Sequence, residues 1–180
     1  MLRKKKFGST NKSFEIGNIV DLFTKSKLIL SSGAKYQNIP ASYQTYGKLN
    51  KKKTNAILLC HPLSGDQYAA GKHPVTDKKG WWDHIIGPGK TIDTRKYFVI
   101  CSNALGGCMG TFGPNCLNPE TKQNYNLDFP IITISDMVKL QYELICNYFE
   151  IEKLFAVIGG SMGGMLALEW ASKYPQKIHC

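Results

Sequence analysis

The sequence predicts an α/β domain with a mostly parallel sheet and flanking helices. Three short apolar runs, residues 55–61, 97–103 and 154–160, recur along the chain. Their near-continuous Ile, Leu, Val and Phe content, in place of alternation, is typical of strands that are covered on both faces. Helical patterns and glycine-rich segments separate the runs. This succession of strands and helices is the signature of the α/β class.

Length and composition indicate one globular domain. The chain has 180 residues, of which 43% are hydrophobic and 20% charged. No apolar run reaches the roughly 18 residues of a membrane span, and no apolar segment follows the basic start MLRKKK as a secretion signal requires. Cys60 and Cys101 end apolar runs and are expected to be small buried hydrophobes, and no CxxC pair occurs. We therefore expect a cytoplasmic protein without a metal.

The net charge of +10 lies entirely in the N-terminal third. Residues 1–53 contain 12 Lys or Arg against 2 Asp or Glu, whereas residues 54–180 contain 11 of each kind. A cationic arm could bind phosphate or anionic lipid, but no base-stacking array of aromatic residues accompanies it. A solvated tail is favoured, and we expect binding to neither nucleic acid nor membrane.

The N-terminal segments are predicted in order. The first two dozen residues lack a sustained period and are expected to be a loose lead-in that touches the body through FEIGNIVDLF. Residues 26–50 contain two pieces rich in β-formers on either side of a Ser-Gly turn, which predicts a hairpin.

Two helices are predicted. Residues 135–150 would begin at an N-cap, Ser135 or Thr133, and bury one face. That face contains Met137, Leu140, Leu144, Ile145 and Tyr148. The second helix, MLALEWASKYP, would stop at Pro175.

Two long irregular segments, residues 60–97 and 103–131, are rich in Gly, Pro, Asn and Trp. Both follow the carboxyl end of a predicted strand, where open α/β sheets place their ligand sites. Loops of this length are uncommon in compact domains unless they bind something or form lids.

The motif Gly159-Gly160-Ser161-Met162-Gly163 lies between a predicted strand and a predicted helix. It matches the GxSxG nucleophile elbow, in which a sharp turn lifts the serine hydroxyl above the sheet edge. A side chain at Gly159 or Gly163 would collide with the neighbouring strand or helix. A phosphate loop is disfavoured, because the P-loop lysine and the GxGxxG spacing are absent. Plain close packing of helix on strand remains the other interpretation.

The loop after the first apolar run supports the elbow. In elbow enzymes this loop supplies one amide of the oxyanion hole, and the residue after the nucleophile supplies the other. The backbone amides of Leu63 and Met162 are the predicted donors. His61 is expected to hold this loop as a structural imidazole, and none of the other histidines is assigned as the catalytic base. These are His73, His84 and His179.

Four segments together indicate a family. CHPLSGD, GWWDHIIGPGKTIDTRKYFVICSNALGGCMGTFGPNCLNP, LDFPIITISDMV and LFAVIGGSMGGMLALEWASKYP occur in this order. From about Gln37 onward the chain closely resembles the homoserine O-acetyltransferases, acyltransferases of methionine biosynthesis with the α/β-hydrolase fold. The resemblance divides the chain into a basic lead-in with the start of the hairpin, residues 1–36, and an incomplete hydrolase domain, residues 37–180, truncated after the nucleophile helix.

The resemblance implies a reaction and a set of site residues. Ser161 would take an acetyl group from acetyl-CoA and pass it to the hydroxyl of L-homoserine, with no cofactor beyond this co-substrate. Asn103, Gly106 and Gly107 would bind substrate near the mouth of a tunnel, with GWWD close by. The full-length family member is commonly a homodimer.

The resemblance also implies missing parts. The family's acid, base histidine and substrate-binding arginine follow the serine well downstream, yet only 19 residues follow Ser161 here. We expect the polypeptide alone to be inactive. We also expect a bare sheet edge beside residues 154–160 and an exposed apolar face on the last helix.

Alternatives stay open at this point. A serine esterase on the same fold would use water as the acceptor, and a non-catalytic remnant or interaction module would retain only the front half of the fold. A nucleic-acid-binding protein would use the basic arm. The residues decide neither between acetyl and succinyl donors nor between homoserine and serine acceptors.

Overall fold

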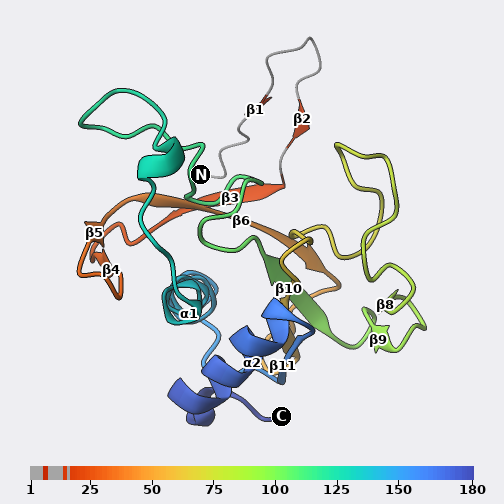
Figure 1. Ribbon diagram of the computed structural model, residues 1–180. Helices are drawn as coiled ribbons and strands as arrows, with labels where there is room; N and C mark the ends of the chain where they lie inside the picture. Colours follow the sequence, from red (N-terminus) through yellow and green to blue (C-terminus); the bar gives the residue numbers. More distant parts are fainter. Residues whose placement is uncertain (1–5, 8–13, 16) are drawn as a thin grey trace.

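A five-stranded sheet forms the centre of the computed structural model, which describes residues 6–7, 14–15 and 17–180. The strand order is β11-β7-β10-β6-β3 (Figure 1). The three predicted apolar runs are β7 (Ala56–Cys60), β10 (Phe98–Ser102) and β11 (Ala156–Gly159), and they pair in parallel. The antiparallel strands β6 (Ile39–Tyr46) and β3 (Asn18–Leu22) extend the sheet beyond β10. The predicted α/β class, with parallel strands at the centre of the sheet, is confirmed.

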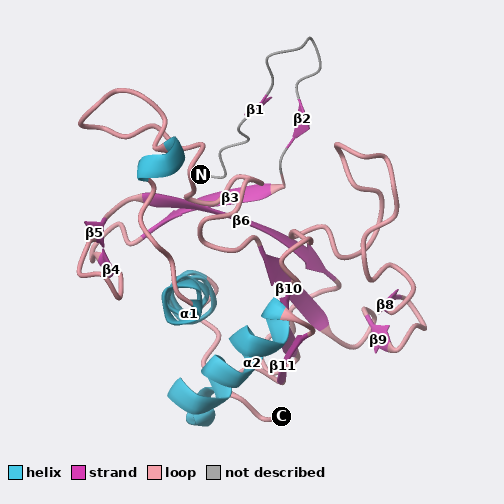
Figure 2. Ribbon diagram, in the orientation of Figure 1, coloured by secondary structure: helices cyan, strands magenta, loops and turns pink. Residues whose placement is uncertain are grey.

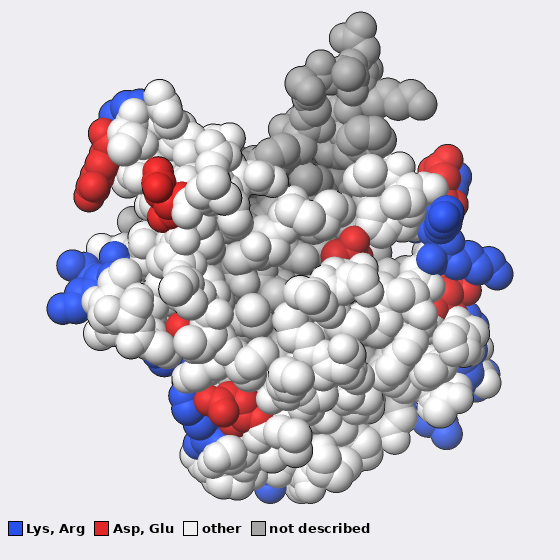
Figure 3. Space-filling model, viewed as in Figure 1, with Lys and Arg blue, Asp and Glu red and all other residues white. Residues whose placement is uncertain are grey.

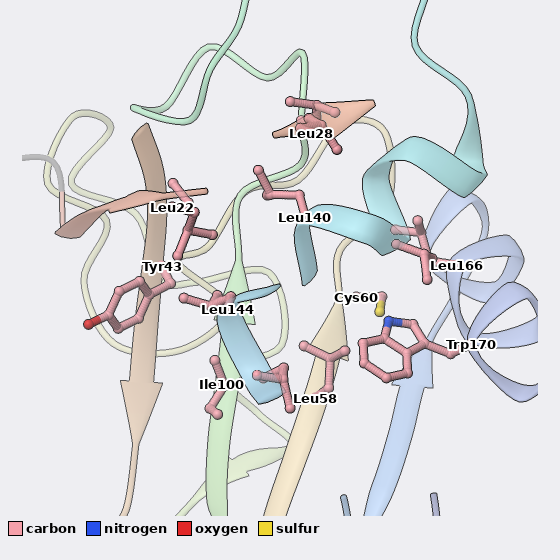
Figure 4. Close-up of a cluster of buried hydrophobic side chains, with 14 of the residues drawn as sticks. Leu22, Leu28, Tyr43, Leu58, Cys60, Ile100, Leu140, Leu144, Leu166 and Trp170 are labelled. Atoms are coloured by element: carbon pink, nitrogen blue, oxygen red, sulfur yellow. The ribbon is translucent and has the colours of Figure 1, made fainter. Parts of the chain in front are cut away.

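Each face of the sheet is covered differently. On one face, Ala56, Leu58 and Cys60 pack against the two long helices in the cluster drawn in Figure 4. On the other face, Ile57 and Leu59 pack against residues of the loop that joins β7 to β10. The expectation of flanking helices therefore holds for one face, whereas a loop covers the other.

The loop that covers the second face contains little regular structure. Within it, β8 (Ile86–Gly87) and β9 (Ile92–Asp93) form a two-residue parallel pair, and Trp81 and Trp82 pack on the sheet beside them. The segment after β10 is irregular except for the 3-10 helix η1 (Asn126–Asp128) (Figure 2). Both segments were predicted as long loops.

The first helix changes type along its length. Helix α1 (Ile134–Tyr142) begins at Thr133, which forms a capping box with Asp136, and it continues into the π-helical turn η2 (Glu143–Tyr148). Of the two N-cap candidates, Thr133 is therefore the correct one.

The predicted apolar face of this segment is correct only in part. Leu140, Leu144 and Ile145 are buried, but Met137 is half-buried and Tyr148 is 40% exposed. A π-helical turn bonds residue i to residue i+5, so the 3.6-residue period used for the prediction fails after Tyr142.

The second helix, α2 (Met162–Lys173), ends before Pro175 as predicted, and the 3-10 helix η3 (Pro175–Lys177) follows it. Its inner side contributes Leu166 and Trp170 to the core. Trp170 Nε1 donates to Oε1 of the buried Gln141 of α1 at 2.8 Å, which ties the two helices together. Outside the core, Met165 and Leu168 are 58% and 73% exposed, as expected for the last helix.

The N-terminal region holds one correct and one wrong prediction. The hairpin exists as β4 (Leu28–Ile29) and β5 (Lys35–Tyr36), but β6 beyond it pairs with β10 and β3. The lead-in does touch the body through FEIGNIVDLF, as predicted, because this segment contains β3. The expectation that it is loose is wrong there, since β3 pairs with β6 and forms the edge of the sheet.

Most of the basic start of the chain lies outside the described residues. The part that is described there is the short antiparallel pair β1 (Lys6–Phe7) and β2 (Phe14–Glu15). On the face drawn in Figure 3, the basic side chains lie in separate groups, mainly near the edges. Over the described part of the chain, no helix combines the length and the hydropathy needed to cross a bilayer.

The edge of the sheet beside β11 is not bare. The Leu154 amide donates to the Lys177 carbonyl at 2.8 Å, and the His179 amide donates to the Leu154 carbonyl at 3.0 Å. Residues 177–180 thus run parallel to the start of β11. The expectation of a bare edge is wrong along this stretch.

The two buried cysteines behave as predicted. Cys60 and Cys101 are 1% and 0% exposed, and both are free thiols. Burial raises the pKa of the Cys60 thiol to about 12, partly offset by a hydrogen bond from Gln141. The thiol is therefore neutral at physiological pH and packs as a small apolar group.

Asp136 connects the hairpin to α1. Its carboxylate is fully buried and accepts hydrogen bonds from the Ser31 amide at 2.9 Å, from Lys139 Nζ at 3.0 Å and from Thr133 Oγ1 at 2.8 Å. Burial acts to raise the pKa of this carboxyl, but the hydrogen bonds from Lys139, Thr133 and Ser31 outweigh it and hold the pKa below its ordinary value.

We predict that Asp136→Asn lowers the free energy of unfolding by about 2 kcal/mol at neutral pH, because buried donors lose their acceptor. The lowered pKa means that the carboxylate stabilises the fold fully above about pH 4 and progressively less as pH falls through its folded pKa. Urea unfolding across pH should therefore show the difference between wild type and variant narrowing in acid. The exposed Asp128→Asn is the control, and a constant difference at every pH would contradict the prediction.

Candidate active site

Ser161 lies at the sharp turn between β11 and α2. Its backbone has φ 57° and ψ −127°, a conformation that costs a non-glycine residue about 1–3 kcal/mol and that clusters at functional sites. The residue is exposed, and among the described residues its hydroxyl has no hydrogen-bond partner. The strained turn and the free hydroxyl are those expected of a nucleophile elbow.

The glycines around Ser161 are required for space. A Cβ atom on Gly159 would lie 2.3 Å from the Gly163 carbonyl oxygen, and one on Gly163 would lie 2.1 Å from the Cys60 carbonyl oxygen. The predicted collisions at both positions are therefore confirmed. Gly160 differs, because a Cβ atom there would meet no heavy atom within 4 Å.

The contact at Gly163 brings two loops together. Because this glycine touches the carbonyls of Cys60 and His61, the first turn of α2 packs on the end of β7 where the next loop begins. Leu63 of that loop is 81% exposed, and its amide donates to no group in the described part of the chain. The Met162 amide opens α2 and is likewise free there. Both amides are thus available to an external acceptor near this end of the sheet.

His61 holds the loop as expected. The ring is 4% exposed, its Nδ1–H donates to the Pro62 carbonyl at 2.8 Å, and its Nε2 accepts from the Ala104 amide at 3.0 Å. Burial lowers the pKa of the imidazole, and the bond to Pro62 offsets part of this effect. A neutral ring with both nitrogens engaged joins the loops after β7 and β10 and cannot serve as the base for Ser161.

The remaining histidines do not partner Ser161 either. His73 Nε2 lies 2.7 Å from Asp66 Oδ2, so it is engaged in its own loop. His84 is exposed, and the His179 amide bonds to Leu154 at the opposite end of β11 from the elbow.

The predicted substrate residues lie on the loop after β10. Asn103 is 2% exposed, and its backbone is fixed by Ser42 and Thr111. Gly106 has φ +84°, and a Cβ on Gly107 would lie 2.6 Å from Asn103 Oδ1. The turn therefore depends on both glycines, while the Asn103 side chain is enclosed rather than open to solvent.

Sequence reasoning missed the polar network behind this loop. Gln67 is fully buried, and its Nε2 donates to Ser42 Oγ at 2.9 Å and to the Met109 carbonyl at 3.0 Å. Thr111 Oγ1 accepts from the Ser42 amide and donates to the Asn103 carbonyl. The contacts with Ser42 and Met109 have no local sequence signal, because these partners lie 25 to 69 residues away along the chain. Within the described residues, no group of three or more His, Cys, Asp or Glu could hold a metal ion.

The fold and the elbow define a class of protein. A family model described as the alpha/beta hydrolase fold matches residues 55–180. The chain therefore belongs to the α/β-hydrolase fold family.

Individual relatives agree with the resemblance found in the sequence. The chain is 55% identical over 168 residues to the homoserine O-acetyltransferase of Methanococcus vannielii, covering 91% of this chain and 34% of that protein. The crystal structure of homoserine O-acetyltransferase from Bacillus anthracis matches with a TM-score of 0.80 at 40% identity, covering 89% of this chain and 43% of that one.

An esterase matches equally well. The crystal structure of esterase E22 also gives a TM-score of 0.80 at 40% identity, covering 89% of this chain and 44% of that one. The chain thus spans between about a third and under half the length of these proteins.

We predict that Gly163→Ala lowers the free energy of unfolding by about 3 kcal/mol, since the added methyl group must push the Cys60 carbonyl or α2 aside. Gly160→Ala is the matched control, and it should change stability by about 0.5 kcal/mol or less. Urea denaturation of the two variants measures the difference. Equal stabilities would show that the close approach of helix and strand is not required.

Proposed function

We propose that the chain carries the nucleophile and oxyanion side of a homoserine O-acetyltransferase. The observation that carries the proposal is the backbone of Ser161, held at φ 57° with an exposed hydroxyl at the start of α2. The identity to homoserine O-acetyltransferases supports the choice of acetyl-CoA as donor and L-homoserine as acceptor. The reaction would serve methionine biosynthesis in the cytoplasm.

The proposed reaction has two steps. Ser161 Oγ attacks the thioester carbonyl of acetyl-CoA, so that the Oγ–C bond forms, the C–S bond breaks and CoA leaves as the thiol with the serine proton. The hydroxyl of homoserine then attacks the acetyl-serine, gives O-acetylhomoserine and returns its proton to Ser161. Neither step needs a metal or a further cofactor, because the thioester carries the activated acyl group.

The free amides of Leu63 and Met162 would stabilise both tetrahedral intermediates. The negative charge develops on the former carbonyl oxygen, and the α2 N-terminus adds a favourable dipole there. Loss of one such donor costs on the order of 3 kcal/mol of transition-state stabilisation. Asn103, Gly106 and Gly107, on the loop after β10, are proposed to form part of the substrate-binding site.

The base that activates Ser161 is proposed to lie outside these 180 residues. In the described part of the chain no side chain hydrogen-bonds to Ser161, and the matched proteins are more than twice as long. Without the triad acid and histidine, acyl transfer by this polypeptide should fall several orders of magnitude below that of an intact triad enzyme.

A serine esterase is the second candidate, and the match to esterase E22 favours it. Both reactions share the acyl-serine and differ only in the acceptor, which is water in the esterase. The fold and elbow serve both equally well, so the acceptor must be measured.

We predict that exposure to acetyl-CoA adds one acetyl group to Ser161. Intact-mass and peptide mass spectrometry should find the adduct on the peptide that contains Ser161. The adduct should form slowly, because no side chain of the described residues is bonded to Ser161 as a base. Ser161→Ala should abolish it, whereas Ser64→Ala, in the neighbouring loop, should not. An adduct on another residue, equally present in Ser161→Ala, would overturn the proposed nucleophile.

We further predict that L-homoserine accelerates the release of CoA from acetyl-CoA and is converted to O-acetylhomoserine. The measurement compares thiol release with and without L-homoserine and identifies the product by mass. An equal rate of CoA release with and without L-homoserine, with acetate as the sole acyl product, would contradict the acyltransferase and support the esterase.

A further inference from the structure

A cavity lined by none of the elbow residues lies beside the start of β6. It has a volume of about 670 Å³, is partly open to solvent, and is lined by residues 36–40 and by residues of the loop 107–125. Of the residues predicted for the active site, it includes only Gly107. Its volume is within the range of small-molecule sites, roughly 300–1,000 Å³.

Three aromatic rings form an ordered part of its wall. The Tyr36 and Phe112 ring centroids lie 4.9 Å apart, and those of Phe112 and Tyr125 lie 5.7 Å apart at an interplanar angle of 89°. Phe112 and Tyr125 are 6% and 9% exposed. Because the rings pack on one another, the wall is preformed, and a planar ligand can contact it without ordering side chains first.

Carboxamide side chains supply the polar groups of the lining. They come from Gln37, Asn38, Asn115 and Asn124. Within the described residues only Gln37 bonds internally, to the Thr24 carbonyl at 3.3 Å, and the other three side chains are exposed, so their amide groups can bond to water or to a ligand. Each carboxamide offers both donors and an acceptor. A ligand that matches them carries both kinds of group along one edge.

The lining carries no formal charge. Among its described residues there is no Lys, Arg, His, Asp or Glu. Burial raises the pKa of Tyr36 and Tyr125, and the negative charge of Glu120 raises both further, so the two hydroxyls stay protonated. An anion in this cavity would lose hydration and be repelled by Glu120, and a cation would find no carboxylate within the lining itself.

We propose that this cavity is a binding site for a neutral, planar aromatic ligand that carries hydrogen-bond donors and acceptors on its edge, as an aromatic carboxamide does. The aromatic wall provides the contact surface, and the amides of Asn38, Asn115 and Asn124 fix the orientation. The site goes beyond the proposed acyl transfer and does not depend on it.

The experiment uses the 180-residue chain labelled with nitrogen-15 and four probes of similar size. Benzamide is the expected ligand, benzoate and benzamidine replace its amide by an anion and a cation, and cyclohexanecarboxamide removes the planar ring. Benzamide should shift the backbone amide resonances of residues 36–39, 107–113 and 115–117 saturably. The other three should bind at least about fivefold more weakly, as expected for the loss of one well-made interaction.

The double variant Asn115→Ala and Asn124→Ala tests the polar lining. It should weaken benzamide binding about fivefold or more, whereas Gln176→Ala, an exposed side chain outside the cavity, should leave binding unchanged. The amide spectra of both variants report whether the fold is retained. Equal shifts by all four probes, shifts outside this lining, or unchanged binding by the folded double variant would each overturn the proposal.

Discussion

The site depends on one close approach, that of Gly163 to the carbonyl of Cys60, where a Cβ atom would lie 2.1 Å from the oxygen. No larger residue lets the first turn of α2 press on the end of β7. With that contact made, the chain between β11 and α2 has few residues in which to reverse, and Ser161 takes up the strained φ of 57°. The same contact places the loop after β7 beside the free amide of Met162. The positions of the proposed nucleophile and of the proposed oxyanion donors thus follow from one packing constraint.

Buried polar contacts hold the pieces that this constraint brings together. His61 bonds the Pro62 carbonyl and the Ala104 amide, which links the loops after β7 and β10. Gln141 accepts from Trp170 and joins α1 to α2 on the face behind the elbow. A buried polar group is costly unless it is paired, so each of these contacts also disfavours alternative arrangements of its loop. The irregular segments around the site are therefore fixed by specific bonds, although they contain little regular structure.

The sequence predicted what is dictated locally. The strands β7, β10 and β11 are recognisable because burial on both faces demands continuous apolar residues, and the elbow is recognisable because only glycine fits at positions 159 and 163. The contact made by FEIGNIVDLF was predicted but its strand was not, because β3 has only five residues and just two of their side chains are buried. The π-helical turn displaced Tyr148 from the expected face. Gln67 and Thr111 were missed because both bond to Ser42, which lies 25 residues from Gln67 and 69 from Thr111, separations that no local pattern encodes.

The proposed reaction has two requirements, positioning of a nucleophile and its activation, and they can be considered separately. The groups proposed for positioning lie within the described residues: the turn at Ser161, the α2 N-terminus and the free amides of Leu63 and Met162. Activation is absent there, because His61 has both ring nitrogens engaged and His73 is bonded to Asp66. Oxyanion stabilisation alone retains a measurable fraction of a triad enzyme's catalysis. Under the proposed mechanism, Ser161 is therefore acylated slowly without a base, and a base would supply the rest of the rate.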